Sequence, residues 1–156
     1  MDVRYGNGER ILMNSDFSVA VHALVYLAHK GCRLSSEALA DNVCTNAARV
    51  RKVMARLCAR GLVTSAEGAE GGYGLAVPAD DIALDAVADA IGGRFVSISW
   101  KSGDVDRECL VSSGMGGIMD EIYDDLDERC RQRLHEMTIG GIVRRIFDAD
   151  RKEKAS

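Results

Sequence analysis

The fold is decided by residues 44–78, which read CTNAARVRKVMARLCARGLVTSAEGAEGGYGLAVP. Asn46 is a residue type that favours the position just before a helix. The apolar residues after it recur at spacings of three and four, which is the period of a helix with one buried face; they are Val50, Val53, Met54 and Leu57. Gly61 is suited to the position just after the end of a helix. The pattern therefore predicts a helix from Asn46 to Arg60.

The polar face of this predicted helix is basic. Residues 44–60 contain five arginines and lysines and no acidic residue, although the whole chain of 156 residues has a net charge of −4. The five are Arg49, Arg51, Lys52, Arg56 and Arg60. Local charge of this kind on an otherwise acidic protein indicates a polyanionic partner. A solvated charged face is the alternative, and the absence of any interleaved acid disfavours it.

A small β-wing is expected directly after the basic helix. Residues 62–65 form the first predicted strand, and residues 73–77 form the return strand, which Pro78 stops. The loop between them, AEGAEGG at 66–72, contains glycines that permit positive φ.

Two helices are predicted upstream. Apolar spacing indicates a first helix from Asn14 that ends at Gly31, and Ser35 or Ser36 caps a short second helix. A break at Cys44 and Thr45 separates the second helix from the basic one. Helix, short turn and basic helix together make the helix-turn-helix pattern.

Downstream, a short helix is predicted over 82–91, then an irregular segment over 92–108. Trp100 in this segment can line a small-molecule pocket between domain and arm or anchor the loose connection, and we favour the anchor. A longer helix is expected over 110–137, and Thr138 caps a last helix that reaches Phe147. The long helix carries one apolar stripe, formed by Val111, Met115, Ile118, Ile122, Leu126, Cys130, Leu134 and Met137. Such a stripe must be buried. It can fold back on its own domain, or it can pair with a second copy, which the order of elements favours.

The predicted fold class is mainly α with a small β-wing, a winged helix-turn-helix followed by a long C-terminal dimerisation helix. We divide the chain into a flexible extension (1–12), a DNA-binding domain (13–92), a linker with dimerisation helices (93–147) and a frayed tail (148–156).

Two stretches resemble the Rrf-two family of transcriptional regulators. NSDFSVAVHALVYLA, residues 14–28, is similar to the family's first helix, and LVTSAEGAEGGYGLAVPADDIALDAVADAI, residues 62–91, is similar to its wing and following helix. The segment up to Phe147 resembles the family's dimerisation arm more loosely. The resemblance implies a homodimer, a repressor on a palindromic duplex DNA operator, with the third helix in the major groove and the wing at the minor groove.

The residues that this resemblance assigns to DNA contact lie on the basic helix and the wing. They are Thr45, Asn46, Arg49, Arg51, Lys52, Arg56, Gly71 and Gly72. The wing departs from the family pattern, because Ala66 and Glu67 stand where relatives carry a basic residue, and Glu70 adds a second negative charge.

Many relatives hold an iron–sulfur cluster on three closely spaced cysteines after the fourth helix. Residues 92–112 contain only Cys109, and one thiolate cannot replace three. We therefore expect no cofactor and no metal.

Cys44 and Cys109 suggest a thiol switch across the dimer. Cys44 precedes the basic helix and lies near its positive end, which favours the thiolate, and Cys109 precedes the long helix. The alternative is that both thiols are inert, since free cysteine is often simply buried.

No enzyme motif is present: the sequence has neither a P-loop nor GxSxG nor GxGxxG, so no catalytic residue is assigned. The longest apolar run is too short for a bilayer, and no segment resembles a signal peptide, so we expect a cytoplasmic protein. The serious alternative is a winged helix for protein–protein contact or small-molecule sensing, with weak or lost DNA binding.

Overall fold

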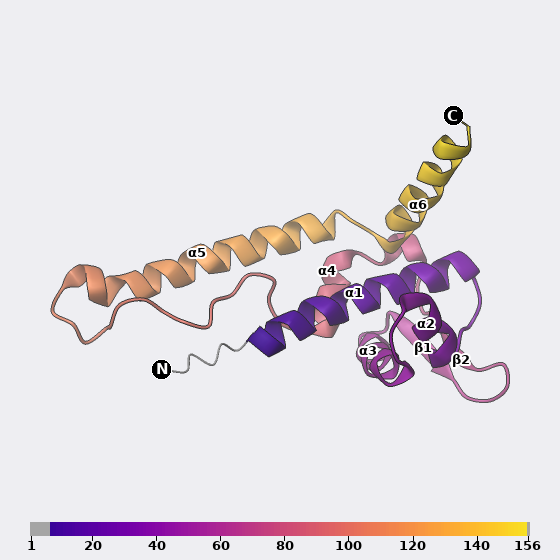
Figure 1. The fold of residues 1–156 in the computed structure, drawn as a ribbon, viewed down its shortest axis with the longest axis horizontal. Helices are drawn as coiled ribbons and strands as arrows, with labels where there is room; N and C mark the ends of the chain where they lie inside the picture. The colour runs from indigo at the N-terminus through magenta and orange to yellow at the C-terminus, as the bar shows by residue number, and fades with distance from the viewer. Residues whose placement is uncertain (1–6, 156) are drawn as a thin grey trace.

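The computed structural model describes residues 7–155, and of residues 7–14 it describes the backbone alone. The elements in chain order are α1 (Asn7–Lys30), α2 (Ser36–Val43), α3 (Ala47–Ala59), β1 (Val63–Ala66), β2 (Gly72–Leu75), the 3₁₀ turn η1 (Ala79–Asp81), α4 (Leu84–Ile91), α5 (Leu110–His135) and α6 (Ile139–Lys154). Figure 1 shows a head that contains α1 to α4 and the two strands, and an arm that contains α5.

Helix α1 lies at the centre of the head. It contacts α2, α3, α4, α6 and β2, so apolar residues are needed on several of its sides. Ala20, Ala23, Leu24 and Leu27 are all buried. The core beneath α1 is completed by large side chains that are fully buried, among them Leu39, Met54, Leu57, Ile82 and Ile139. This core confirms the predicted mainly helical fold with a small sheet.

Three predicted N-caps are present. The side chain of Ser35 accepts a hydrogen bond from the Ala38 N–H at 3.1 Å, Asn46 accepts one from the Arg49 N–H at 2.8 Å, and Thr138 accepts one from the Gly141 N–H at 3.0 Å. Each bond satisfies a donor that the first turn of a helix leaves unpaired. Between α2 and α3, Cys44 adopts a left-handed conformation (φ 61°) that reverses the chain.

The wing is an antiparallel pair in which Val63 opposes Leu75 and Ala66 opposes Gly72. Leu34 extends this sheet: its N–H donates to the Tyr73 carbonyl at 3.0 Å, and the Tyr73 N–H donates to the Leu34 carbonyl at 2.8 Å. Gly72 lies against this contact with φ +110°, and a Cβ there would stand 2.5 Å from the Leu34 carbonyl oxygen. Only glycine fits at position 72 without moving the wing.

The irregular segment 92–109 lies beside α5 (Figure 1) and is held there by Asp127. The buried Asp127 carboxylate accepts hydrogen bonds from the N–H groups of Phe95 (2.8 Å) and Val96 (3.0 Å). The Phe95 ring also meets the Phe17 ring edge-on, with centroids 5.1 Å apart. Trp100 was expected to anchor this segment, but it is 71% exposed. Phe95 makes the anchoring contact instead.

The predicted ends of the chain need correction. Helix α1 begins at Asn7, so residues 7–12 are helical rather than an irregular extension, while residues 1–6 lie outside the described range. Helix α6 continues to Lys154, whose Nζ pairs with an Asp150 oxygen at 2.8 Å. The charged tail is therefore helical through residue 154, because charges spaced four apart can pair along a helix.

Candidate nucleic-acid interface

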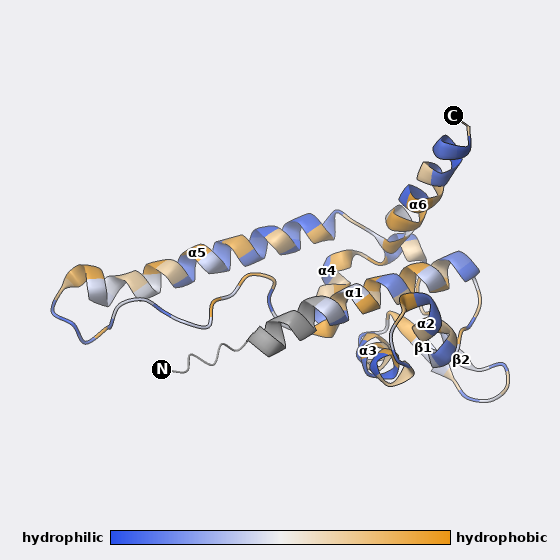
Figure 2. Ribbon diagram, viewed as in Figure 1, coloured by the Kyte–Doolittle hydropathy of each residue, from blue (hydrophilic) through white to orange (hydrophobic). Residues whose placement is uncertain are grey.

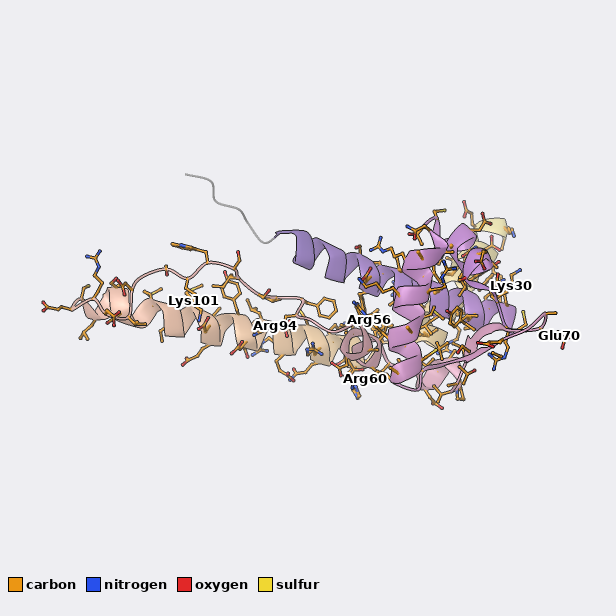
Figure 3. All side chains as sticks on the ribbon, turned by 90° about the horizontal axis from the view of Figure 1, so that it is seen from below. Lys30, Arg56, Arg60, Glu70, Arg94 and Lys101 are labelled. Carbon is orange, nitrogen blue, oxygen red and sulfur yellow. The ribbon has the colours of Figure 1, made fainter. Side chains whose placement is uncertain are left out.

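Helix α3 buries one face and exposes the other. Val50, Val53, Met54 and Leu57 face the core, whereas Ala48, Lys52, Ala55 and Ala59 are exposed on the opposite side. Figure 3 shows α3 between the wing, with Glu70 at its tip, and the arm, which carries Arg94 and Lys101. With Arg51, which is also exposed, α3 has five exposed residues, and three of them are alanines, so its outer surface is narrow.

Two of the arginines predicted to contact DNA, Arg49 and Arg56, pair with a carboxylate of α1 in the single chain. Arg49 Nε and Nη2 lie 3.0 and 2.9 Å from Asp16 Oδ1, and Nη2 lies 2.5 Å from the Ser15 hydroxyl. Arg56 Nη1 lies 3.5 Å from Asp16 Oδ2 and donates to the Ile91 carbonyl at 3.2 Å. Both guanidinium groups are thus engaged inside the head.

The other two predicted basic contacts lie outward. Arg51 pairs with Glu37 at 3.2 Å and with the Ser36 hydroxyl at 3.1 Å, in a position where both charged side chains are more than half exposed. The Glu37 pKa is lowered, first by its own backbone N–H and then by Ser36 and Arg51. An exposed pair of this kind is weak, so a phosphate can compete for Arg51. Lys52 is exposed and has no hydrogen-bond or ion-pair partner in the described part of the chain.

The remaining predicted DNA contacts of the head, Thr45 and Asn46, lie in the turn before α3. Asn46 is exposed, and its side-chain oxygen Oδ1 accepts the capping hydrogen bond from the Arg49 N–H, which leaves the side-chain NH₂ as a donor. Thr45 beside it is half-buried. Both residues stand at the N-terminus of α3, where the helix dipole favours negative charge.

Gly71 and Gly72 shape the wing. A Cβ at Gly71 would collide with the Ala66 carbonyl oxygen, and a Cβ at Gly72 would collide with Leu34. Glu67 and Glu70 are exposed in the same loop. The wing also has a basic residue that the sequence reasoning missed: Arg33 donates to the Gly72 carbonyl at 3.0 Å and to the Thr64 hydroxyl at 3.0 Å. No pattern marks Arg33, because its partners lie more than thirty residues away.

Cys44 and Cys109 are not brought together within one chain. Cys44 lies in the head between α2 and α3, whereas Cys109 is the N-cap of α5, which begins at the end of the arm farthest from the head (Figure 1). Both are exposed. The backbone N–H groups of Ser112 and Val111 lower the pKa of the Cys109 thiol. Cys32 is exposed, and Cys58 and Cys130 are half-buried.

The side chains present do not fit an iron–sulfur cluster. From residue 15 to residue 155, no three histidine, cysteine, aspartate or glutamate side chains gather in a way that could hold a metal ion. The segment between α4 and α5 supplies one thiol, Cys109. No step that needs such a cluster is assigned to this chain.

The sequence matches the Rrf2 family, described as iron-dependent transcriptional regulators, over residues 13–145. No curated protein matches it. Within residues 7–155, no helix has both the length and the apolar character needed to cross a bilayer.

Several solved structures share the fold. A protein of Lactobacillus plantarum described as a transcriptional regulator has a TM-score of 0.72 and 22% identity, over 90% of this chain and 98% of its own. IscR of T. potens has a TM-score of 0.65 and 18% identity, over 86% and 87% of the two chains. CymR, the global cysteine regulator of B. subtilis, has a TM-score of 0.61 and 18% identity, over 82% and 92%.

Proposed function

This chain belongs to the Rrf2 family of transcriptional regulators, and from that membership we propose that it binds a palindromic duplex DNA operator as a cytoplasmic homodimer and represses transcription there. The observation that carries the proposal is the outer surface of α3. It combines an exposed Lys52, an exposed Arg51 and a capped N-terminus on a helix that is otherwise lined by alanine. Such a helix can lie in a major groove while its cations meet phosphate and base edges.

The homodimer is supported by the apolar stripe of α5. Val111, Met115, Ile118, Ile122 and Leu126 are between 36% and 70% exposed, and Figure 2 shows apolar residues recurring along the arm. Exposed apolar residues in a continuous row mark a surface that another molecule covers. A second copy is the occupant we propose, because a two-fold dimer presents two heads to the two halves of a palindrome.

The head offers a second apolar surface to that partner. An open groove of about 380 Å³ lies between α1, α4 and α6. It is lined mainly by apolar side chains, which include Phe17, Val21, Val25, Leu84, Ile142 and Ile146. In a symmetric dimer, this groove can receive part of the partner's arm, while the partner's groove receives the same part of this arm.

The redox response remains part of the proposal. α5 has 26 residues and therefore spans about 39 Å at 1.5 Å per residue, so the Cys109 end of one arm can reach the head of the other protomer. If Cys109 pairs with Cys44 there, peroxide should produce a covalent dimer on non-reducing gels that dithiothreitol reverses. Cys44→Ser and Cys109→Ser should each prevent that dimer. A covalent dimer that survives either substitution would refute the pairing.

DNA binding is tested by mobility shift over a salt series, with the wild-type protein and Lys52→Ala on the same duplexes. Binding through phosphates must weaken steeply as salt rises. Lys52→Ala should weaken binding to all sequences alike and make the slope of log K against log salt shallower by about 0.9 per protomer. Gln132→Ala, on α5, is the matched control and should leave the slope unchanged.

The acidic wing favours one alternative, a winged helix that contacts protein rather than DNA. Glu67 and Glu70 are exposed where a phosphate backbone would pass. Wild-type protein that shows no salt-dependent shift on any duplex, including a pool of random sequence, would support this alternative and refute the DNA-binding proposal.

A further inference from the structure

Asp16 is a buried carboxylate that faces α3. It is 8% exposed, and it lies on α1 rather than on the helix that it contacts. One of its oxygens accepts from Arg49 at 2.9 and 3.0 Å, and the other lies 3.5 Å from Arg56. A single aspartate of α1 thus engages two of the cations of α3.

The two arginines stand on one side of α3, seven residues and about two turns apart. Their side chains are 30% and 36% exposed, compared with 54% for Arg51. Additional acceptors hold each of them in place: the Ser15 hydroxyl for Arg49 and the Ile91 carbonyl for Arg56. Figure 3 shows Arg56 on the side of α3 that faces the arm.

We propose that Asp16 is a positioning and specificity-determining residue that withholds Arg49 and Arg56 from DNA. The proposal rests on the proposed DNA binding. Arg49 is held by charge-assisted hydrogen bonds to the buried carboxylate, which are strong, and Arg56 is held by an ion pair with it and by the Ile91 carbonyl. The two arginines therefore stay on α1, and phosphate and base contact is left to Arg51 and Lys52. Fewer mobile cations mean weaker binding to DNA of arbitrary sequence, since phosphate neutralisation supplies most non-specific affinity.

The same pairs fix the orientation of α3. Arg49 lies in its first turns and Arg56 in its last, so Asp16 ties both halves of the helix to α1. Asp16 could act only by attaching α3 to α1, or it could also keep the two arginines away from DNA. These two roles predict different results when the carboxylate is removed. Loss of the attachment lowers the free energy of unfolding, whereas release of the arginines changes the number of phosphates that the protein neutralises.

The test measures the salt dependence of binding to a duplex of mixed sequence. Asp16→Asn should bind this duplex more tightly than wild type, with a slope of log K against log salt that is steeper by about 0.9 to 1.8 per protomer, one contact for each released arginine. Asp150→Asn makes the same change in net charge near the end of α6, where Asp150 pairs with Lys154, and should leave the slope unchanged.

A triple variant, Asp16→Asn with Arg49→Gln and Arg56→Gln, removes the carboxylate together with both cations and avoids an unpaired buried charge. Its slope should equal that of wild type. A slope that is shallower than wild type in the triple variant, or unchanged in folded Asp16→Asn, would overturn the proposal. Wild-type protein without salt-dependent binding would instead refute the proposed function, so the two failures are distinguishable.

Discussion

Asn46 combines two roles that substitution can separate. Its side-chain oxygen caps α3 by accepting from the Arg49 N–H at 2.8 Å, while its amide NH₂ is available to a phosphate or a base. The cap is a folding contribution, and the amide is a binding contribution. In the proposed complex both arise from one side chain, because the N-terminus of α3 is the end of the helix that approaches DNA.

Asn46→Ala should lower the free energy of unfolding by about 1 kcal/mol and also weaken DNA binding. Asn46→Ser keeps a capping oxygen, so its stability should stay within about 0.5 kcal/mol of wild type, while its DNA affinity falls with the loss of the amide donor. Denaturant unfolding and mobility shift measure the two effects. Wild-type affinity in Asn46→Ser would show that Asn46 is a cap alone.

At the scale of elements, Asp127 joins α5 to the segment that precedes it. Burial of the Asp127 carboxyl raises its pKa. The N–H groups of Val96 and Phe95 and the Arg131 guanidinium lower the pKa by more than burial raises it, so the pKa in the folded state lies below the ordinary value. Arg94 adds a contact at 3.6 Å. The stabilisation is fully present above the aspartate pKa of the unfolded chain and is lost as the pH falls through the lower pKa of the folded state.

Asp127→Asn should lower the free energy of unfolding at neutral pH by about 1–3 kcal/mol, because the two backbone hydrogen bonds lose their charge assistance and the ion pairs with Arg94 and Arg131 are lost. The variant should also lose less stability than wild type as the pH falls below 4. Asp125→Asn is the control, since Asp125 pairs with Arg129 at the surface of the same helix; it should change stability by less than about 0.5 kcal/mol. Equal pH profiles for wild type and Asp127→Asn would contradict the assignment.

The elements themselves were predictable where the signal is local. Ser35, Asn46 and Thr138 cap helices because a side-chain oxygen reaches a backbone donor three residues later, which the sequence displays directly. Arg49 was predicted as a DNA contact because it stands among other cations. Its partner Asp16 lies 33 residues away on another helix, and no spacing rule relates the two. The segment between α4 and α5 was predicted as irregular, but the way it is held was not predictable, since Asp127 binds it from more than thirty residues downstream.

At the scale of the whole molecule, the arm carries an apolar stripe that its own chain buries only in part. From Val111 to Leu126 the stripe of α5 faces outward, whereas Leu134 near the end of α5, and Met137 just after it, pack against the core of the head. The last part of the stripe is therefore buried by its own chain. The first part is exposed in the single chain, where α5 extends beyond the head (Figure 1), and we propose that a second copy covers it.

The double variant Ile122→Asp with Leu126→Asp should convert the dimer into a monomer in sedimentation experiments, because dimerisation would bury two charges without partners. Gln132→Glu adds negative charge on the polar face of α5 and should remain dimeric. The head should stay folded in the double variant, since both side chains are more than 40% exposed in the single chain.

DNA affinity should then fall at low protein concentration, because each head must bind its half-site alone and the advantage of joined heads is lost. A double variant that still sediments as a dimer, or a wild-type protein that sediments as a monomer, would assign the stripe to a different partner and remove the two-fold symmetry on which a palindromic operator depends.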